Sequence, residues 1–242
     1  MMNNVTVVKF GSDLVTDQDG IDIDRIKNHI SKLYKIEKLV IVTSGAVVTG
    51  KALFRSSGQD IVTKTSDNDL KFFAGLGCTE VFHAFEKAFR ECGRLAASYP
   101  ITHNDLDDSS SFLSALRLNL EKGVVTVLNE ADAFSQTELM QLKTGGDNDG
   151  LAAHVAKSID ADELILVTEY GGVVDDSDGL IKVVDSSNIS AVRAMVETRR
   201  NSGNGRGGIA SKLEAAWAAA QSGVDSKITD ENYQTTTKFM IG

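Results

Sequence analysis

Two lysines stand where the chain could place positive charge beside a phosphate group. Lys9 lies near the end of a buried apolar run, Val5–Phe10, and the turn Gly11–Ser12 follows directly. Such a glycine turn lets backbone N–H groups approach phosphate oxygens, and a nearby lysine can neutralise developing charge. Lys212 lies one turn into a helical pattern that begins after Gly207–Gly208, which indicates a second anion site of the same kind. Taken alone, each segment also fits a solvated strand end or a surface loop.

A second group of candidate residues is polar and follows two other apolar runs. Ser44–Gly45 closes the run Leu39–Thr43 and, taken by itself, is an ordinary tight turn. Asn129–Asp132 follows Val124–Leu128, and Asp147–Asp149 opens a helix soon afterwards. One of these residues could simply cap that helix, but three polar groups in succession exceed what one cap requires. Asparagine supplies both a donor and an acceptor, which suits an α-amino and α-carboxylate pair.

Several other kinds of site are missing from the sequence. The Walker A spacing G-x-x-x-x-G-K-[ST] does not occur, and no G-x-G-x-x-G follows the first apolar run. No Ser-His-Asp or Cys-His arrangement is evident, and the four histidines lack metal-ligand spacing. The pattern therefore favours a transferring phosphoryl group stabilised by lysines and backbone donors, with no protein-bound metal.

These residues need a scaffold that brings the ends of several strands together. Short apolar runs alternate with helical patterns along most of the chain, and each run is apolar on both faces. That alternation predicts an α/β fold, a three-layer αβα sandwich with a mainly parallel central sheet. Ligands in such sheets bind beyond the carboxyl ends of the strands, so functional residues should gather there. The expected strands end at Phe10, Thr43, Thr102, Leu128 and Thr168.

Helical spacing and turn residues divide the rest of the chain. Helices are expected at Asp24–Ile36, Ser111–Lys122, Asp149–Ile159 and Ile209–Ser222. The stretch Asp67–Cys92 predicts one or two helices, interrupted near Gly75–Gly77. Gly171–Val184 predicts a hairpin with an acidic turn, Thr198–Gly208 a polar loop, and Ser226–Thr229 and Lys238–Ile241 short strands. No linker interrupts the pattern, so we expect one domain over residues 1–242.

The composition argues against two classes of partner. The chain has 25 basic and 34 acidic residues and a formal net charge of −9, so phosphate backbones should repel it. No apolar stretch approaches the roughly 20 residues that cross a bilayer. The N-terminus lacks the basic and apolar regions of a signal peptide. We therefore expect a cytoplasmic protein with neither nucleic acid nor a membrane as its partner.

In their order along the chain, these segments resemble the motifs of the amino acid kinase family. The matching segments are Val7–Ser12, Ile41–Val47, Gly123–Asp132, Gly146–Asp149 with Leu151–Ala153, Leu164–Thr168 and Gly205–Leu213. Within that family they are most similar to the glutamate 5-kinase group, which makes γ-glutamyl phosphate at the start of proline biosynthesis. The match spans nearly the whole chain. It implies ATP and Mg²⁺ as cofactors, glutamate or a similar small acid as the substrate, and a homo-oligomer.

The resemblance also implies a role for each candidate residue. Lys9 and Lys212 would hold the γ-phosphoryl group as it moves, and Asp149 would orient both lysines. Five polar residues would line the acceptor site: Ser44, Asn129, Asp132, Asp147 and Asn148. Residues in four loops would border the nucleotide and its phosphates: Gly11, Ser12, Gly45, Thr168, Glu169, Gly207 and Gly208. A γ-carboxylate, with a pKa of about 4.3, is already ionised at neutral pH, so the reaction needs no histidine base.

Four positions depart from the family pattern. Ala131 replaces an asparagine, Glu169 an aspartate, Thr126 a proline and Arg206 a small hydroxyl residue. Many bacterial relatives also carry a C-terminal RNA-modification-type domain, which we do not expect in this chain. Two alternatives therefore stay open. One is a sister kinase that acts on carbamate, aspartate or N-acetylglutamate, and the other is a non-catalytic nucleotide-binding regulator.

Overall fold

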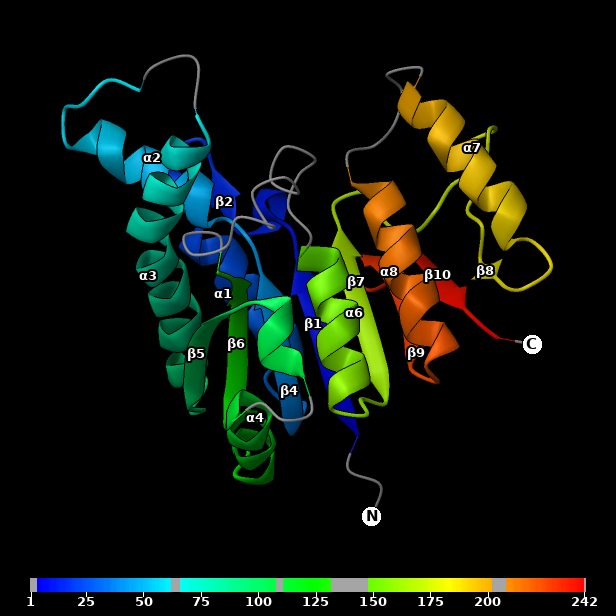
Figure 1. The fold of residues 1–242 in the computed structure, drawn as a ribbon, viewed down its shortest axis with the longest axis horizontal. Helices are drawn as coiled ribbons and strands as arrows, with labels where there is room; N and C mark the ends of the chain where they lie inside the picture. Colours follow the sequence, from blue (N-terminus) through cyan, green and yellow to red (C-terminus); the bar gives the residue numbers. More distant parts are fainter. Residues whose placement is uncertain (1–3, 62–65, 108–110, 132–147, 202–207, 242) are drawn as a thin grey trace.

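A computed structural model describes residues 4–61, 66–107, 111–131, 148–201 and 208–241. Its centre is an eight-stranded sheet in the order β5-β6-β4-β1-β7-β9-β10-β8 (Figure 1). The strands are β1 (Val5–Phe10), β4 (Lys38–Thr43), β5 (Ala96–Ile101), β6 (Val125–Glu130), β7 (Glu163–Thr168), β8 (Val183–Val184), β9 (Asp225–Asp230) and β10 (Thr236–Phe239). A separate pair of short strands, β2 (Thr16–Asp17) and β3 (Gly20–Ile21), lies beyond the end of β1.

The six strands from β5 to β9 in this order are parallel to one another. β10 runs antiparallel to β9, and the short β8 is parallel to β10. The four inner strands β6, β4, β1 and β7 are buried along nearly their whole length, which explains why they are apolar on both faces. The predicted mainly parallel sheet is therefore confirmed.

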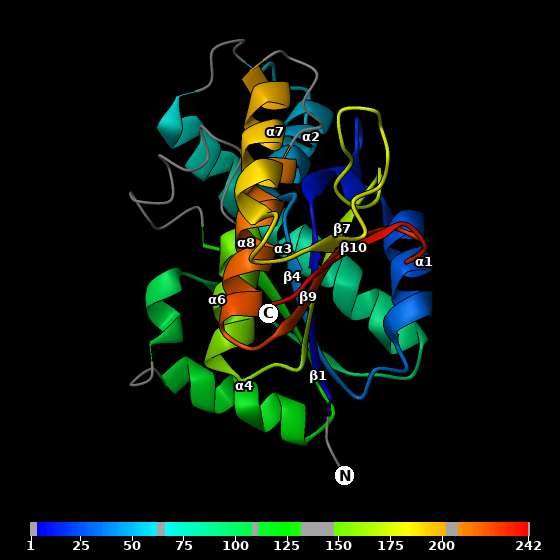
Figure 2. The same ribbon diagram turned by 90° about the vertical axis from the view of Figure 1, so that its right-hand side faces the viewer.

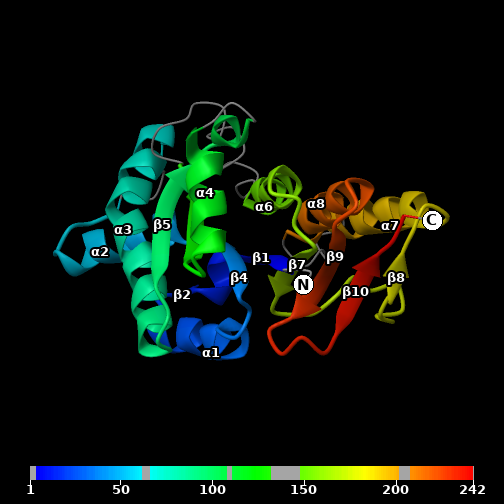
Figure 3. The same cartoon turned by 90° about the horizontal axis from the view of Figure 1, so that it is seen from below.

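Helices cover both faces of the sheet and complete the three layers (Figure 2, Figure 3). Side chains of α1 and α3 share one buried apolar cluster with the sheet, and those of α4, α6, α7 and α8 share the other. The helices are α1 (Ile23–Leu33), α2 (Ala46–Ser56), α3 (Asp67–Glu91), α4 (Ser111–Glu121), α6 (Asn148–Ser158), α7 (Ile189–Asn201) and α8 (Ile209–Gln221), with short 3₁₀ turns η1 (Ser12–Leu14) and η2 (His103–Leu106). In the described ranges, none of these helices has the length and apolar character needed to cross a membrane.

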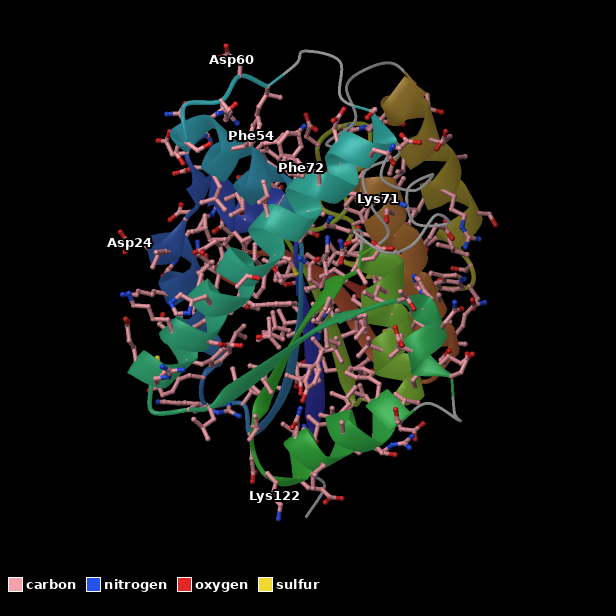
Figure 4. The ribbon with its side chains drawn as sticks, turned by 60° about the vertical axis from the view of Figure 1, so that its left-hand side comes forward. Asp24, Phe54, Asp60, Lys71, Phe72 and Lys122 are labelled. Atoms are coloured by element: carbon pink, nitrogen blue, oxygen red, sulfur yellow. The ribbon has the colours of Figure 1, made fainter. Side chains whose placement is uncertain are left out.

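The expected interruption near Gly75–Gly77 was wrong, because α3 is continuous from Asp67 to Glu91. Gly77 instead allows α2 and α3 to approach closely. A Cβ atom there would lie 2.0 Å from the carbonyl oxygen of Ala46, and one at Gly50 would lie 1.8 Å from that of Phe73. Near this crossing, the side chains of α2 and α3 meet in edge-to-face aromatic contacts, including Phe54 with Phe72 (Figure 4).

Two further elements differ from the sequence expectations. Helix α7 occupies Ile189–Asn201, where no helix was expected and the last residues were assigned to a loop. In the expected hairpin, Val174 and Leu180 form an isolated antiparallel bridge, while Val183–Val184 pairs with β10 instead. The helix predicted at Ser111–Lys122 is confirmed, and Gly123 ends it in the left-handed conformation with φ of 67°.

Candidate active site

The carboxyl ends of four neighbouring strands are in register at one edge of the sheet. Phe10, the last residue of β1, pairs with Thr43 on β4 and with Val167 on β7. Thr43 in turn pairs with Asn129 on β6. The chain leaves β1 for β4 on one side and later places β7 on the other side, so β1 is a topological switch point. The described candidate residues at these strand ends therefore lie at one edge of the sheet, as the sequence predicted.

Asp149 joins the two candidate lysines. Lys9 Nζ lies 2.7 Å from Asp149 Oδ1, and Lys212 Nζ lies 3.3 Å from Asp149 Oδ2. The three side chains are at most 10% exposed. Lys9 comes from β1, while Asp149 and Lys212 come from the first turns of α6 and α8, whose N-terminal ends point to the same edge of the sheet (Figure 1). Because each carboxylate oxygen contacts one amine, Asp149 fixes the spacing of the two positive charges.

Burial and charge act against each other in this cluster. Burial alone would raise the pKa of the Asp149 carboxyl, but the charges of Lys9 and Lys212 outweigh it and the pKa is lowered. Burial lowers the pKa of the Lys212 amine, the charge of Lys9 adds to this effect, and Asp149 opposes it only in part. The two amines share the Asp149 carboxylate, and the negative charge of Asp13, on the wall of the adjoining cleft, also acts on Lys212.

Two glycines begin helices at this edge with a backbone conformation that other residues adopt at a cost. Gly45 precedes α2 with φ of 105°, and Gly208 precedes α8 with φ of 76°. No side chain caps either helix through a hydrogen bond. The first N–H groups of α2 and α8 are therefore available to an anion. A Cβ atom at Gly208 would lie 3.4 Å from Lys212 Nζ, so glycine also leaves room beside the amine.

A cleft extends from the lysine cluster toward β7. It has a volume of about 600 Å³, open solvent included, and is lined by residues of η1, the loop after β7, α7 and α8. These residues are Asp13, Thr168, Glu169, Tyr170, Gly171, Gly172, Val173, Val174, Val196, Arg199, Ile209 and Lys212. A lining that combines apolar side chains with Lys212 fits a nucleoside joined to phosphate groups.

The residues at the rim of this cleft are held by specific contacts. Thr168 Oγ1 donates to the carbonyl oxygen of Gly171 at 2.6 Å. Glu169 Oε1 accepts from Arg25 Nη2 at 2.9 Å. Gly11 is extended with φ of −70°, and a Cβ atom there would lie 2.3 Å from Asp13 Oδ1 and 3.8 Å from Lys9 Nζ. Glycine at this position therefore lets the Asp13 carboxylate approach the backbone beside the lysine cluster.

On the opposite side of β1, Asn129 and Asn148 form a buried polar wall. Asn148 Oδ1 accepts from the backbone N–H of Glu130 at 3.3 Å, which ties the start of α6 to the end of β6. Asn129 is 1% exposed, and among the described residues neither its amide nitrogen nor its amide oxygen has a hydrogen-bond partner. Buried amides are rarely left unpaired, so these atoms indicate an unseen partner. Ser44 follows the neighbouring strand end and is half-buried.

Three candidate residues, Asp132, Asp147 and Gly207, lie outside the described residues, as does Arg206. Ser12 is described at the start of η1, where its carbonyl oxygen accepts from Thr16 Oγ1 at 2.8 Å. Within the described ranges, no group of three or more histidine, cysteine, aspartate or glutamate side chains could hold a metal ion.

Sequence reasoning missed Asp13 and Arg25. Asp13 follows the Gly11–Ser12 turn immediately, so its position after β1 was a usable signal. Arg25 had no comparable signal, because its partners Glu169 and Glu231 are distant in the chain and only the fold brings them together.

The sequence matches the model of the amino acid kinase family over residues 4–230. The chain belongs to this family. Among curated relatives, glutamate 5-kinase from Marinomonas sp. is 33% identical over 237 residues, covering 92% of this chain and 60% of that protein. Glutamate 5-kinase from Pseudomonas putida is 32% identical over 242 residues, covering 92% of this chain and 61% of that protein. The chain thus spans about three fifths of the length of these relatives.

Solved structures support the fold at lower sequence identity. Carbamate kinase from Giardia lamblia bound to AMP-PNP has a TM-score of 0.68 and 13% identity, with 99% of each chain covered. N-acetylglutamate synthase from Neisseria gonorrhoeae, complexed with coenzyme A and N-acetyl-glutamate, has a TM-score of 0.64 and 17% identity. That match covers 96% of this chain and 55% of the other. At these identities the likeness concerns the fold alone.

Proposed function

We propose that this chain is an ATP-dependent phosphotransferase that phosphorylates the γ-carboxylate of L-glutamate. The observation that carries this proposal is the cluster in which Lys9 and Lys212 contact the two oxygens of Asp149 at the end of the central strand. Transfer of a phosphoryl group to a carboxylate brings two anions together. Fixed positive charge at the point of contact is what such a reaction most requires.

The proposed step is a direct displacement. One oxygen of the acceptor carboxylate bonds to the γ-phosphorus of ATP, the bond from that phosphorus to the β,γ-bridging oxygen breaks, and ADP leaves with the electron pair. No proton moves, because the carboxylate is ionised at neutral pH. Lys9 and Lys212 neutralise the oxygens of the phosphoryl group, Asp149 holds both amines in place, and the N–H groups at Gly11, Gly45 and Gly208 donate to phosphate.

On the nucleotide side, the cleft between the loop after β7 and α8 accepts the nucleoside. Thr168 and Glu169 border it. Gly207, which precedes Gly208 in the sequence, is assigned to this side from the family motif. Magnesium, when bound to the ATP phosphates, supplies further charge neutralisation. Asp13, a carboxylate on the cleft wall, is a suitable oxygen donor toward that ion.

On the acceptor side, the amide of Asn129 is the main support for an amino acid. Its donor and acceptor atoms have no partner among the described residues, and an α-carboxylate and α-amino group could supply one each. Ser44 and Asn148 lie on the same side of β1, and we assign Asp132 and Asp147 to this site from the family motif. Relatives named glutamate 5-kinase at 32–33% identity support glutamate as the acid.

Hydroxylamine trapping tests the proposal, because an acyl phosphate reacts with hydroxylamine to give a hydroxamate. The purified chain with ATP, Mg²⁺ and L-glutamate should form γ-glutamyl hydroxamate, and omission of ATP should abolish it. Turnover with aspartate, N-acetylglutamate or carbamate in place of glutamate would contradict the acceptor assignment and retain the reaction class. ATP binding with no turnover of any of these acids would indicate a nucleotide-binding regulator.

Four further expectations stay predictions from the sequence and the family. They are a single domain over residues 1–242, a homo-oligomeric state, a cytoplasmic location and the lack of a nucleic-acid partner.

A further inference from the structure

The nucleotide side of the site holds two carboxylates as well as the cations Arg199 and Lys212. Asp13 and Glu169 both line the cleft that reaches Lys212. A triphosphate carries several negative charges, so a carboxylate that faces it with no cation between them would weaken its binding. Glu169 is not free to do so, because Arg25 binds it from outside the cleft.

Arg25 uses all three nitrogens of its guanidinium group. Nη2 donates to Glu169 Oε1 at 2.9 Å and to Glu231 Oε1, while Nε donates to Glu231 Oε2 at 3.1 Å. Nη1 donates to the carbonyl oxygen of Asp13. Contacts on three sides of a planar group fix its orientation, and paired contacts to a carboxylate are among the strongest that arginine makes.

The partners of Arg25 come from three adjacent strands. Asp13 follows β1, Glu169 follows β7 and Glu231 follows β9, and these strands are neighbours in the sheet. Arg25 itself lies in the first turn of α1, where its backbone N–H donates to the cap residue Asp22 at 2.9 Å. One side chain therefore ties together the segments that follow three adjacent strands, two of which line the cleft.

The length of the side chain at position 169 suits this arrangement. Glu169 reaches Arg25 at 2.9 Å, and the two side chains are 31% and 24% exposed, so solvent screens the pair only in part. An aspartate here would end one methylene earlier, roughly 1.5 Å short of the guanidinium. Glutamate is therefore long enough to bring its carboxylate to Arg25.

We propose that Arg25 is a positioning residue for nucleotide binding. It holds the Glu169 carboxylate, and so keeps that negative charge away from the polyphosphate, and it also binds the backbone carbonyl of Asp13. The inference rests on the proposed function only in treating the cleft as the nucleotide site.

The test is a calorimetric titration of the full chain with AMP-PNP in the presence of Mg²⁺, which measures nucleotide affinity. AMP-PNP is an ATP analogue whose γ-phosphoryl group is not transferred. Arg25→Gln should weaken AMP-PNP binding about tenfold, because Glu169 is released toward the phosphates, and it should leave glutamate affinity within about twofold. In the Arg25→Gln/Glu169→Gln double variant the repelling charge is gone, so AMP-PNP affinity should return to within about threefold of wild type. The matched control is Arg193→Gln, which breaks an exposed bidentate pair with Glu214 and should leave both affinities unchanged.

Two results would overturn the inference. One is AMP-PNP affinity in Arg25→Gln within twofold of wild type. The other is equal loss of both ligands with a lowered Tm and no recovery in the double variant, which is the behaviour of a residue that only supports the fold. If the wild-type chain phosphorylates glutamate but Arg25→Gln binds AMP-PNP as the wild type does, this inference alone is refuted. Arg25-dependent AMP-PNP binding by a chain that phosphorylates no acid would refute the proposed function alone.

Discussion

Lys9 Nζ lies 2.7 Å from Asp149 Oδ1, and both side chains are almost fully buried. The other oxygen of the same carboxylate accepts a hydrogen bond from the amine of Lys212. A buried carboxylate between two amines makes the stability of the fold depend on the residues proposed for the chemistry. This coupling leads to predictions for stability as well as for activity.

Asp149→Asn should destabilise the protein strongly. The substitution leaves two buried amines without an anionic partner, so the free energy of unfolding should fall by about 3–5 kcal/mol. Urea denaturation measures this change. Arg193→Gln is the control, because the Arg193–Glu214 pair is 42% and 54% exposed and its loss should cost less than about 1 kcal/mol. Similar small changes in the two variants would show that the Asp149 cluster is not a tightly coupled buried group.

Activity should decline at alkaline pH because of Lys212. Burial lowers the pKa of this amine from the ordinary value of 10.5, so it loses its proton, and its charge, at a lower pH than a free lysine. The alkaline limb of kcat/KM should therefore lie below pH 10.5. A bound triphosphate favours the protonated amine. The alkaline limb of the pH profile of kcat should therefore lie at a higher pH than that of kcat/KM.

Lys212→Arg separates this effect from other titrations. A guanidinium stays protonated to a pH of about 12 or more, so the alkaline limb should move upward in this variant even if the maximal rate falls. An unchanged limb in Lys212→Arg would assign the alkaline decline to another group.

Gly208→Ala should impair nucleotide binding beyond its effect on stability. Both Gly208 and Gly58 have a left-handed backbone, with φ of 76° and 81°, so an alanine at either position should cost about 1–2 kcal/mol. At Gly208 the added Cβ would also approach Lys212 Nζ to 3.4 Å, whereas at Gly58 it would meet no atom within 4 Å. We expect weaker AMP-PNP binding in Gly208→Ala but not in Gly58→Ala, as measured by calorimetry. Equal binding in the two variants would contradict a role for the space beside Lys212.

Two glycines in α3 should respond to alanine with opposite signs. Gly75 has open space around its Cβ position, so Gly75→Ala should stabilise the helix by about 0.5–1 kcal/mol. Gly77→Ala would place a Cβ 2.0 Å from the carbonyl oxygen of Ala46 in α2 and should destabilise the protein by about 1–3 kcal/mol. Thermal unfolding of both variants measures the difference. A stabilising Gly77→Ala would contradict the close helix crossing.

Local patterns were enough to predict the six parallel strands, although β6 continues two residues past the expected end at Leu128 and the short strands β2 and β3 were not expected. Val5–Phe10 and Leu164–Thr168 are apolar on both faces because both faces are covered, and this property is visible without the structure. The turn at Gly11 follows the end of β1, and Asn129 lies next to Glu130, the final residue of β6. Because parallel strands end at one edge, local signals also predicted which residues come together.

Elements whose stability depends on tertiary packing were harder to predict. Helix α2 contains Val47, Val48, Thr49 and Gly50, which have modest helix propensity, and it is stabilised by its crossing with α3. Helix α7 had a usable signal that was overlooked, since Ile189, Val192 and Val196 recur at helical spacing and are all buried. The contacts of Arg25 join segments far apart in the chain, and no local sequence pattern predicts such contacts.

The central claim is that Lys9 acts on the phosphoryl group during its transfer to glutamate. The most direct test compares ATP-dependent γ-glutamyl hydroxamate formation by the wild-type chain and by Lys9→Met, with circular dichroism to establish that both are folded. We expect hydroxamate from the wild-type chain and a rate at least about 100-fold lower in Lys9→Met, because loss of one charge-stabilising donor costs that much. A folded Lys9→Met variant that forms hydroxamate at the wild-type rate would contradict the account.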